Sequence, residues 1–257
     1  MRWGFRRFLG LGLAAVIATA MAGGGAAFAL SLKDHKPHNG VVRAHTMPIQ
    51  GIDVSYWQGD IDWRQVREAG IRFAFIKATE GGDHLDPKFR ENWHGAKRAG
   101  VARGAYHFIY WCRPASEQAA WFIRNVPRDP DALPPVLDLE WHTHSKTCPK
   151  KISRELALKK AQILLDAMER HTGKRPIIYT DPAFHREVLQ GEFRSYHFWL
   201  RSVAAEPAKI YGTRPYAFWQ FTTTGKVPGI KGNVDRNIYN GTPSDWDRVL
   251  NWLEASN

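Results

Sequence analysis

The chain has 257 residues, of which 44% are hydrophobic and 24% are charged, values that exclude a disordered or fibrous protein. The formal net charge of +11 indicates an anionic partner such as a cell-wall polymer, a membrane surface or nucleic acid, without choosing among them. Two cysteines are too few for a disulfide scaffold, or for a tetrahedral zinc site made of cysteine alone. The 11 Trp, 8 Tyr and 13 Phe residues predict a large core, although a carbohydrate-stacking surface would raise the same count.

Residues 1–29 have the pattern of a secretory signal peptide. The first ten carry three arginines and no acid, residues 11–22 are apolar, and Ala27-Phe28-Ala29 is a small-x-small cleavage signature. An uncleaved membrane anchor is the alternative, but glycines at 23–25 break the apolar run, which is short for a span. We therefore expect an exported protein, periplasmic or extracellular, with membrane contact through the N-terminus if cleavage does not occur. Residues 30–48 are polar and rich in turn formers, and we expect a linker there.

From residue 49 onward, short apolar runs alternate with amphipathic stretches. We expect strands at residues 50–54, 73–78, 103–110, 136–139, 176–179, 197–201, 217–221 and 234–238, and helices at 62–69, 87–99, 116–125, 153–172, 182–189 and 244–253. Gly70, Gly100 and Gly173 follow three of these helices as C-terminal caps, and Ser116 and Ser153 precede two as N-caps. The alternation predicts one α/β domain over residues 49–257. We expect an irregular TIM-like barrel, mostly parallel and incomplete on one side, with eight strands and about five regular outer helices.

Four acidic residues fall at the ends of predicted strands. Asp53 ends the first strand, Asp138 and Glu140 end the fourth, and Asp235 lies in the eighth. In a closed barrel the first and eighth strands are neighbours and the following loops open at one mouth, so these four carboxyls can converge. Asp138 and Glu140 lie on the same side of their strand, about 6.5 Å apart along it. A lone acid at a strand end usually caps a turn, but four together favour glycoside cleavage, which needs one protonated and one ionised carboxyl.

Five motifs resemble those of the glycoside hydrolase family 25 lysozymes. The motifs are GIDVSYWQG (51–59), FIKATEG (75–81), GAYHF (104–108), DLE (138–140) and WQF (219–221) through Asn237. They occur in the family's order and spacing, and the resemblance covers residues 48–252, nearly the whole mature chain. The resemblance implies an irregular barrel that cleaves the β-1,4 bond between N-acetylmuramic acid and N-acetylglucosamine in the glycan strands of peptidoglycan. It also implies Glu140 as the general acid, with Asp53, Asp138 and Asp235 completing the acidic site. No cofactor is expected. Tyr56 departs from the family, since many relatives carry histidine there, and this could alter a subsite.

Other side chains near the predicted mouth have two interpretations. The aromatic residues at or near strand ends are Tyr106, Tyr179 and Trp199. They could stack on sugar rings or orient the acetamido group, but core packing explains them equally well. Gln220 is polar within an aromatic run, which predicts a buried hydrogen-bonding role toward the sugar or another site residue. For Lys77 we expect a salt bridge to Glu80 or to one of the site acids.

The two cysteines lie close to predicted strand ends. Cys112 follows the third strand and Cys148 lies in the loop after the fourth, so neighbouring strand ends can bring them together. In an oxidising compartment we expect a disulfide, with two separate thiols as the alternative. His142, His144 and Cys148 match no zinc-ligand spacing, so we expect a solvated loop there and no metal.

The leading functional prediction is a secreted peptidoglycan muramidase. A catalytically inactive cell-wall glycan-binding protein on the same fold is the alternative, although all four acids are present. A nucleic-acid partner is not expected, because the chain lacks a basic stripe interleaved with aromatics. Nothing in the sequence indicates an oligomeric state. For the mechanism we favour attack by the substrate's own acetamido oxygen over attack by a carboxylate, with Asp138 as the first candidate to orient it and Asp235 as the second.

Overall fold

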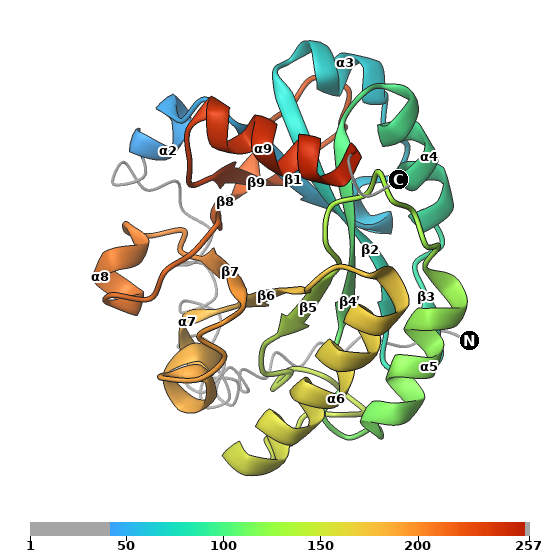
Figure 1. Cartoon of the computed structure of the whole chain (residues 1–257), viewed down its shortest axis with the longest axis vertical. Helices are drawn as coiled ribbons and strands as arrows, with labels where there is room; N and C mark the ends of the chain where they lie inside the picture. The colour runs from blue at the N-terminus through green and yellow to red at the C-terminus, as the bar shows by residue number, and fades with distance from the viewer. Residues whose placement is uncertain (1–41, 255–257) are drawn as a thin grey trace, which may run out of the picture. The chain divides into compact units, whose positions relative to one another are not determined.

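The computed structural model describes residues 42–254, and its central feature is a closed ring of eight strands (Figure 1). The strands are β1 (Gln50–Val54), β2 (Ile71–Glu80), β4 (Ala102–Phe108), β5 (Val136–Leu139), β6 (Ile177–Thr180), β7 (His197–Arg201), β8 (Phe218–Gly225) and β9 (Val234–Tyr239). Their order around the ring is β1, β9, β8, β7, β6, β5, β4 and β2, and parallel pairing of β1 with β2 closes it. A short extra strand, β3 (His84–Leu85), pairs with β2 outside the ring.

The predicted irregular α/β barrel is confirmed, with one correction about where it is irregular. We expected a barrel incomplete on one side, but the sheet itself is closed. The irregularities are β9, which runs antiparallel to both of its neighbours, and the layer of helices around the ring. An alternating apolar pattern is the same for parallel and antiparallel strands, so the direction of β9 was not readable from it.

Five helices of six or more residues correspond to predicted ones: α3 (Trp63–Glu68), α4 (Phe89–Arg98), α5 (Ala115–Asn125), α6 (Arg154–Thr172) and α9 (Pro243–Glu254). The sixth predicted helix is divided into α7 (Pro182–Phe184) and a π-helical turn, η3 (His185–Leu189). Three short helical elements were not predicted: α2 (Val42–Thr46), the 3₁₀ turn η2 (Tyr56–Gln58) and α8 (Pro207–Tyr211). Within residues 42–254 no helix is both long enough and apolar enough to cross a membrane.

The ends of the helices follow local chemistry. The Ser153 side chain accepts a hydrogen bond from the backbone N–H of Leu156 and begins α6, and Gly173 ends that helix with a φ of 73°. The expectation that Ser116 caps α5 is wrong. That helix begins at Ala115, one residue earlier, directly after Pro114, and no side chain caps it.

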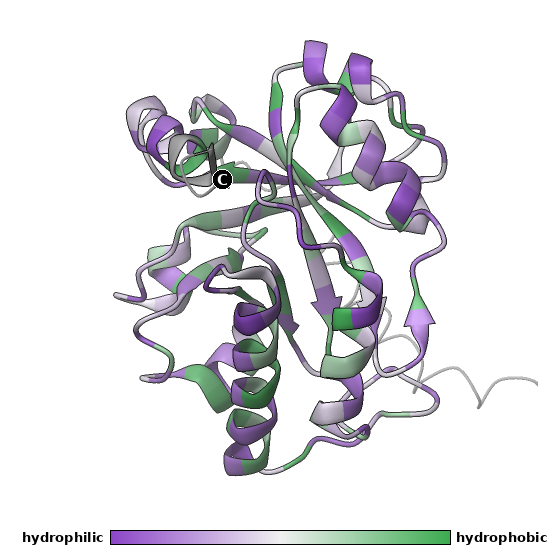
Figure 2. Ribbon diagram, turned by 45° about the vertical axis from the view of Figure 1, so that its right-hand side comes forward, coloured by the Kyte–Doolittle hydropathy of each residue, from purple (hydrophilic) through white to green (hydrophobic). Residues whose placement is uncertain are grey.

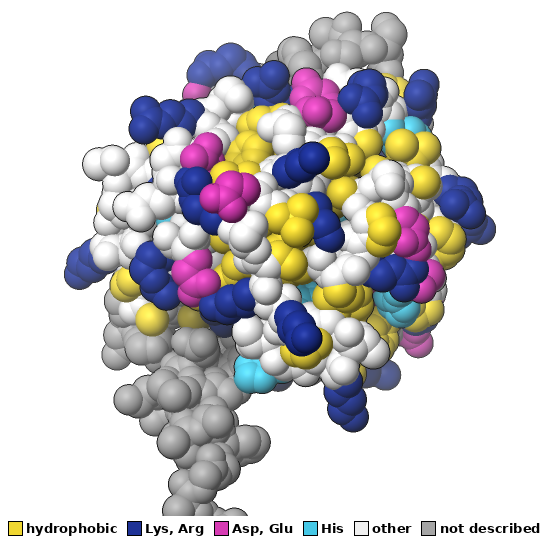
Figure 3. Space-filling view, turned by 90° about the horizontal axis from the view of Figure 1, so that it is seen from below, with side chains coloured by type: hydrophobic (Ala, Val, Ile, Leu, Met, Phe, Trp, Pro, Cys, Tyr) yellow, Lys and Arg dark blue, Asp and Glu magenta, His cyan; other side chains and the backbone are white. Residues whose placement is uncertain are grey.

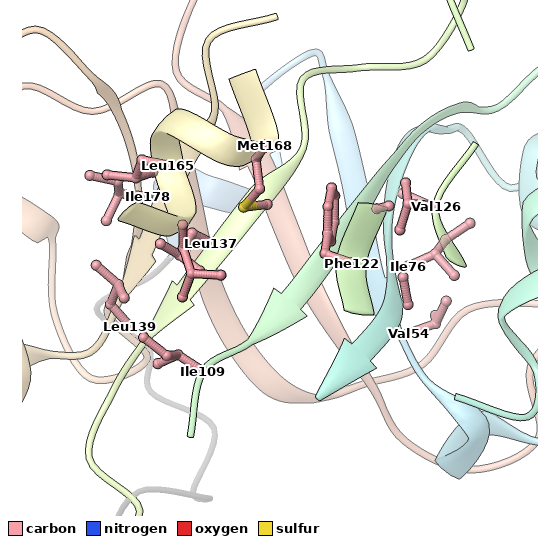
Figure 4. Packing of buried hydrophobic residues seen from close by; sticks show 14 of the residues in the cluster. Val54, Ile76, Ile109, Phe122, Val126, Leu137, Leu139, Leu165, Met168 and Ile178 are labelled. Carbon is pink, nitrogen blue, oxygen red and sulfur yellow. The ribbon is translucent and has the colours of Figure 1, made fainter. Parts of the chain in front are cut away.

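Most of the hydrophobic core lies between the ring and its helices. Leu137 and Ile178 on the strands face Leu165 and Met168 of α6, and Ile76 lies beside the α5 side chain Phe122 (Figure 4). Hydrophobic and hydrophilic residues alternate along α6, as expected for a helix with one buried face (Figure 2). This layer supports most of the strands from the outside, while Trp219 and Phe221 of β8 belong to a separate cluster.

A second hydrophobic cluster fills the inside of the ring with aromatic rings. Phe73, Phe75, Trp199 and Phe218 are 4% exposed or less and belong to one cluster. Gly51 makes room for them, since a Cβ at this position would lie 2.3 Å from the Phe73 ring. These aromatic rings fill the interior of the barrel. The polar side chains that lie beyond them on the inner faces of the strands are therefore confined to the mouth.

The expected linker at residues 30–48 needs a correction for its last part. Residues 42–46 form α2, and the fully buried Ala44 packs in a cluster with Trp219, Phe221 and Ile238. An ion pair of 2.7 Å between Arg43 and Glu206 adds a second tie to the barrel. The predicted signal peptide at residues 1–29 and the rest of the predicted linker, up to residue 41, lie outside the described residues.

Candidate active site

The structure brings the four predicted acids to one mouth of the barrel. Asp53 lies on β1, Asp138 on β5 and Glu140 directly after β5. Asp235 lies near the start of β9 and not near its end, contrary to the expectation that all four acids lie at strand ends. The start of β9 lies at the mouth because this strand runs antiparallel to β1. This reversal still places Asp235 directly opposite Asp53 in the register of the two strands. Burial raises the pKa of both Asp138 and Asp235, and the charges of Asp53 and Glu140 raise each further, as expected for carboxyls that share one site.

Asp53 is held by two side-chain amides. Its Oδ2 accepts hydrogen bonds from Gln220 Nε2 at 2.9 Å and from Asn237 Nδ2 at 2.8 Å. Burial raises the pKa of Asp53 to about 6, while these two hydrogen bonds and the charge of Arg201 oppose the rise. The amides therefore fix the orientation of the carboxyl and favour its ionised form.

Glu140 has the environment of a proton donor. Burial and the nearby charge of Asp181 raise its pKa to about 7, while the cations Arg201 and Lys77 partly offset this effect. Its backbone carbonyl accepts a hydrogen bond of 2.7 Å from the Trp111 indole, which fixes the chain where it leaves β5. At neutral pH a substantial fraction of Glu140 therefore carries a proton.

Asp138 is the most enclosed of the four acids. It is 7% exposed, and its Oδ1 is buried without a hydrogen-bond partner among the described residues. Burial and the charge of Glu140 raise its pKa well above the ordinary value, whereas Lys77 lowers it. Because Asp138 Oδ1 has no such partner, it is available to accept a hydrogen bond from a donor on a bound molecule.

The aromatic residues predicted for sugar contact are mainly part of the barrel interior. Trp199 is 2% exposed and donates from its indole nitrogen to Asn237 Oδ1 at 2.8 Å. Tyr179 is also buried, and its hydroxyl donates to Gln220 Oε1 at 2.9 Å. Their environment matches the core-packing alternative, while Tyr106 is half-buried beside them. Gln220 has the buried hydrogen-bonding position that its place in an aromatic run predicted, and its partners are other site residues.

Three polar residues at the mouth were missed in the sequence. Arg201 ends β7, and its charge opposes the effect of burial, which raises the pKa values of Asp53, Glu140 and Asp235. Asp181 follows β6, and Asn237 lies on β9. Arg201 is detectable in principle, because it lies two residues beyond Trp199 on a correctly predicted strand and so shares its side of the sheet.

The remaining predicted side chains form a wall beside the acids. Lys77 forms a salt bridge with Glu80, which was one of the two expected partners, the other being a site acid. Glu80 also accepts a hydrogen bond from the Tyr110 hydroxyl. His142 stacks on Phe108, with ring centroids 3.9 Å apart. Among residues 42–254, no three His, Cys, Asp or Glu side chains, including those of the His142 loop, are arranged so that they could hold one metal ion.

Cys112 and Cys148 form a disulfide, with their Cα atoms 5.6 Å apart. The backbone N–H of Cys112 also contacts Cys148 Sγ at 2.9 Å. The bond ties the loop that follows β5, which begins at Glu140, to the segment after β4. It therefore constrains the chain on the side of the proposed proton donor.

Basic side chains are dispersed over one face of the protein. On the face drawn in Figure 3, lysine and arginine side chains are scattered among acidic and hydrophobic ones and are not gathered into one stripe. The acids of the mouth, in contrast, are concentrated in one place. A closed barrel whose mouth holds several carboxyls with different pKa values has the composition of a glycoside hydrolase site.

Comparison with known proteins agrees with this class. Residues 52–230 match the glycosyl hydrolases family 25, and the chain belongs to this family. It is 40% identical over 219 residues to the uncharacterized protein YegX of Escherichia coli K12, covering 81% of this chain and 75% of YegX. It is 36% identical to lysozyme M1 of Streptomyces globisporus, covering 77% and 70% of the two chains. Among solved structures, a family 25 glycosyl hydrolase from Bacillus anthracis superposes with a TM-score of 0.75 and 34% identity, covering 83% and 97%.

Proposed function

We propose that this glycoside hydrolase cleaves the β-1,4 bond between N-acetylmuramic acid and N-acetylglucosamine in peptidoglycan. The observation that carries the proposal is Glu140, a half-buried carboxyl at a mouth with three further acids, where desolvation and the charge of Asp181 raise its pKa to about 7. Family membership and the similarity to lysozyme M1 support the choice of substrate. The acids supply the chemistry, and the family supplies the identity of the sugar.

Glu140 is the general acid in this proposal. Cleavage of a glycosidic bond requires a proton on the leaving oxygen, and a carboxyl with a pKa near the working pH can both hold and release one. The burial that raises the pKa of Glu140 also strengthens its hydrogen bond to the leaving oxygen. After the proton has left, Arg201 and Lys77 stabilise the resulting carboxylate, since both lower the pKa of Glu140.

We assign Asp138 to the acetamido group of the sugar at the cleavage position. The acetamido oxygen attacks the anomeric carbon as the bond to the leaving oxygen breaks, and the positive charge that develops on the acetamido group needs a nearby acceptor. The unpartnered Oδ1 of Asp138 is such an acceptor for the acetamide N–H. Water then opens the cyclic intermediate and loses its proton to the Glu140 carboxylate, which restores the acid.

Asp53 and Asp235 have supporting roles. Asp53 is already engaged by Gln220 and Asn237, and this fits a carboxylate that shapes the site and its field rather than one that attacks. Asp235 shares the Gln220 amide at 3.1 Å and is the second candidate for orienting the acetamido group. Both carry negative charge toward the anomeric centre when ionised, where an oxocarbenium-like state would develop.

The direct test is digestion of purified peptidoglycan, followed by borohydride reduction of the new ends and mass spectrometry. Muramitol at the new reducing ends is expected, and glucosaminitol would instead identify a glucosaminidase. The alternative of an inactive glycan-binding protein predicts no new ends with binding retained. A parallel digest with Glu140→Gln controls for contaminating hydrolases, because that variant should release nothing.

We also propose that the enzyme works outside the cytoplasm. The export pattern in residues 1–29 and the disulfide between Cys112 and Cys148 both favour an oxidising compartment. Cell fractionation with N-terminal sequencing of the mature protein tests this. An N-terminus near residue 30 in the exported fraction is expected, whereas an intact N-terminus in the membrane fraction would indicate an anchor.

A further inference from the structure

Two aromatic rings stand exposed beside the mouth of the barrel. Trp57 is 75% exposed and Tyr56 is 37% exposed, directly after the strand that carries Asp53. Their ring centroids are 4.5 Å apart and their planes differ by 32°, so together they present a tilted apolar surface. Indole and phenol rings exposed together next to a cavity usually mark a binding surface.

The backbone under these rings is fixed by hydrogen bonds. Ser55 Oγ accepts from the N–H of Trp57, and Gln58 Oε1 accepts from the N–H of Ser55 at 2.9 Å. The N–H of Tyr56 donates to Asp86 Oδ2 at 3.0 Å, and Asp86 is buried. The rings are therefore held on a rigid turn, so a ligand that covers them orders little of the chain.

A cavity of about 360 Å³ opens against the two rings. Its polar wall includes Glu80, which binds both Lys77 and Tyr110, and Asp83, which pairs with Arg113 at 3.1 Å. Because these charges are already compensated within the wall, it suits an uncharged ligand rich in hydroxyl and amide groups better than a phosphate or a carboxylate.

This cavity is a neighbour of the acidic site. Tyr110 lines it and also lines a second cavity of about 570 Å³ that includes Glu140. Lys77, on the same wall, is near enough to lower the pKa values of Asp138 and Glu140. The aromatic surface and the acids therefore border one continuous stretch of the mouth, over the ends of β1, β2, β4 and β5.

We propose that Tyr56 and Trp57 form a distal glycan subsite, which holds an N-acetylated sugar ring outside the bond that is cleaved. This inference rests on the proposed function and adds to it a determinant of substrate length. The apolar face of a pyranose ring covers the indole, and its hydroxyl and acetamido groups bond to the Lys77, Glu80 and Tyr110 wall. Short glycan fragments bound at the cleavage position do not reach Tyr56 and Trp57, whereas polymeric glycan does.

Calorimetric binding of defined glycans tests the subsite separately from catalysis. The probes are stem-free peptidoglycan disaccharide, tetrasaccharide and hexasaccharide, and the protein carries Glu140→Gln so that the glycan stays intact. Adding Trp57→Ala should weaken hexasaccharide binding about tenfold, the change expected when one aromatic face is no longer covered. Disaccharide binding should change less than about twofold. Trp57→Phe keeps a flat ring and should retain most of the affinity. Ile210→Ala, at a side chain 45% exposed on α8, is the matched control and should change neither.

The outcomes separate the subsite from the proposed function. Equal hexasaccharide affinity with and without Trp57→Ala would overturn the subsite, even if the wild-type enzyme releases muramitol from peptidoglycan. A wild-type enzyme that releases no muramitol would overturn the proposed function, and the binding comparison would still decide the role of Trp57. Trp57 is largely exposed, so its replacement should leave the melting temperature unchanged, and a large drop would assign it a structural role instead.

Discussion

Asp53 and Asp235 lie opposite each other on β1 and β9, and one amide serves both of them: Gln220 Nε2 donates to Asp53 Oδ2 at 2.9 Å and to Asp235 Oδ2 at 3.1 Å. The Tyr179 hydroxyl in turn donates to Gln220 Oε1. This bond orients the amide so that its NH₂ group faces the two acids. Two carboxyls bridged in this way can stay close even when one is ionised, because the N–H group offsets part of their repulsion. Gln220 is therefore a positioning residue, since its effect on substrate passes through the two acids.

Gln220→Leu should lower kcat about 10–100-fold with a smaller change in KM, because two hydrogen bonds to acidic groups are lost. Its pH profile distinguishes positioning from mere destabilisation. The Gln220 hydrogen bond lowers the pKa of Asp53, so its loss should raise that pKa and move the acidic limb of the activity profile to higher pH. Gln162→Leu, on the exposed side of α6, is the control. An unmoved acidic limb in a folded variant would remove Gln220 from this role.

Glu140→Gln should abolish wall clearing while leaving the fold intact. The amide is nearly the same size as the carboxyl but cannot donate a proton to the leaving oxygen, and general acid catalysis contributes about 10²–10⁴-fold. The turbidity of a cell-wall suspension measures the loss, and circular dichroism checks the fold. Glu68→Gln, at an exposed position of α3, should clear walls at the wild-type rate. Wild-type-like clearing by folded Glu140→Gln would assign the acid role to another residue.

The same variant should gain stability at alkaline pH. The pKa of Glu140 is raised from 4.5 to about 7, so between these values the folded protein holds more protons there than the unfolded chain. Its contribution to the free energy of unfolding therefore falls as the pH rises through this window. Glu140→Gln removes the titration and should be more stable than the wild type by about 1–3 kcal/mol near pH 8, with the difference shrinking toward about pH 4. Urea denaturation at both pH values measures this, and a pH-independent difference would contradict it.

The disulfide should contribute to stability more than to chemistry. Cys112 and Cys148 are 36 residues apart in sequence, and closing a loop of this length is worth about 2–4 kcal/mol in chain-entropy models. The double variant Cys112→Ser, Cys148→Ser should lose about this free energy of unfolding but keep activity at low temperature. Peptide mapping without reductant should find the two cysteines linked in exported protein. Two free thiols there would rule out the bond in the working enzyme.

The parts of the fold that follow from local patterns were predictable from the sequence. The bounds of β1, β5 and β7 agree with apolar runs, and Ser153 and Gly173 mark the ends of α6. Alternation likewise placed Asp138 on its strand with Glu140 just beyond. These features depend on neighbours within a few residues, and a single sequence records them.

The parts that depend on distant partners were not predictable in the same way. The five-residue helix α2 is stabilised by contacts of Ala44 with Trp219 and by the pairing of Arg43 with Glu206, not by its own sequence. Trp199 is buried in the aromatic cluster inside the ring, and its indole N–H donates to Asn237, 38 residues away. The direction of β9 follows from its pairing with β1 and β8, so Asp235 reaches the mouth from the opposite end of its strand. Each case is set by tertiary contacts.

The mechanism makes a prediction about the substrate. If the acetamido oxygen attacks the anomeric carbon, a glycan whose muramic acid at the cleavage position lacks the N-acetyl group loses the nucleophile itself. The tethered group acts at a high effective concentration, so no external nucleophile replaces it easily. Cleavage at that position should almost disappear, while binding should largely persist because the rest of the strand is unchanged. The fully acetylated glycan of the same length is the control.

Asp138 supplies a second arm for this test. Asp138→Asn keeps the size of the side chain but can never take up a negative charge, so it cannot stabilise the positive charge that develops on the acetamido group. It should lower kcat on the acetylated glycan by about 10²–10³-fold and have little further effect on the deacetylated one, because both changes remove the same step. Undiminished turnover of the deacetylated glycan by the wild-type enzyme would eliminate acetamido participation. The attacking group would then be a carboxylate of the mouth, with Asp138 and Asp235 as the candidates, and trapping a covalent glycosyl ester would identify which.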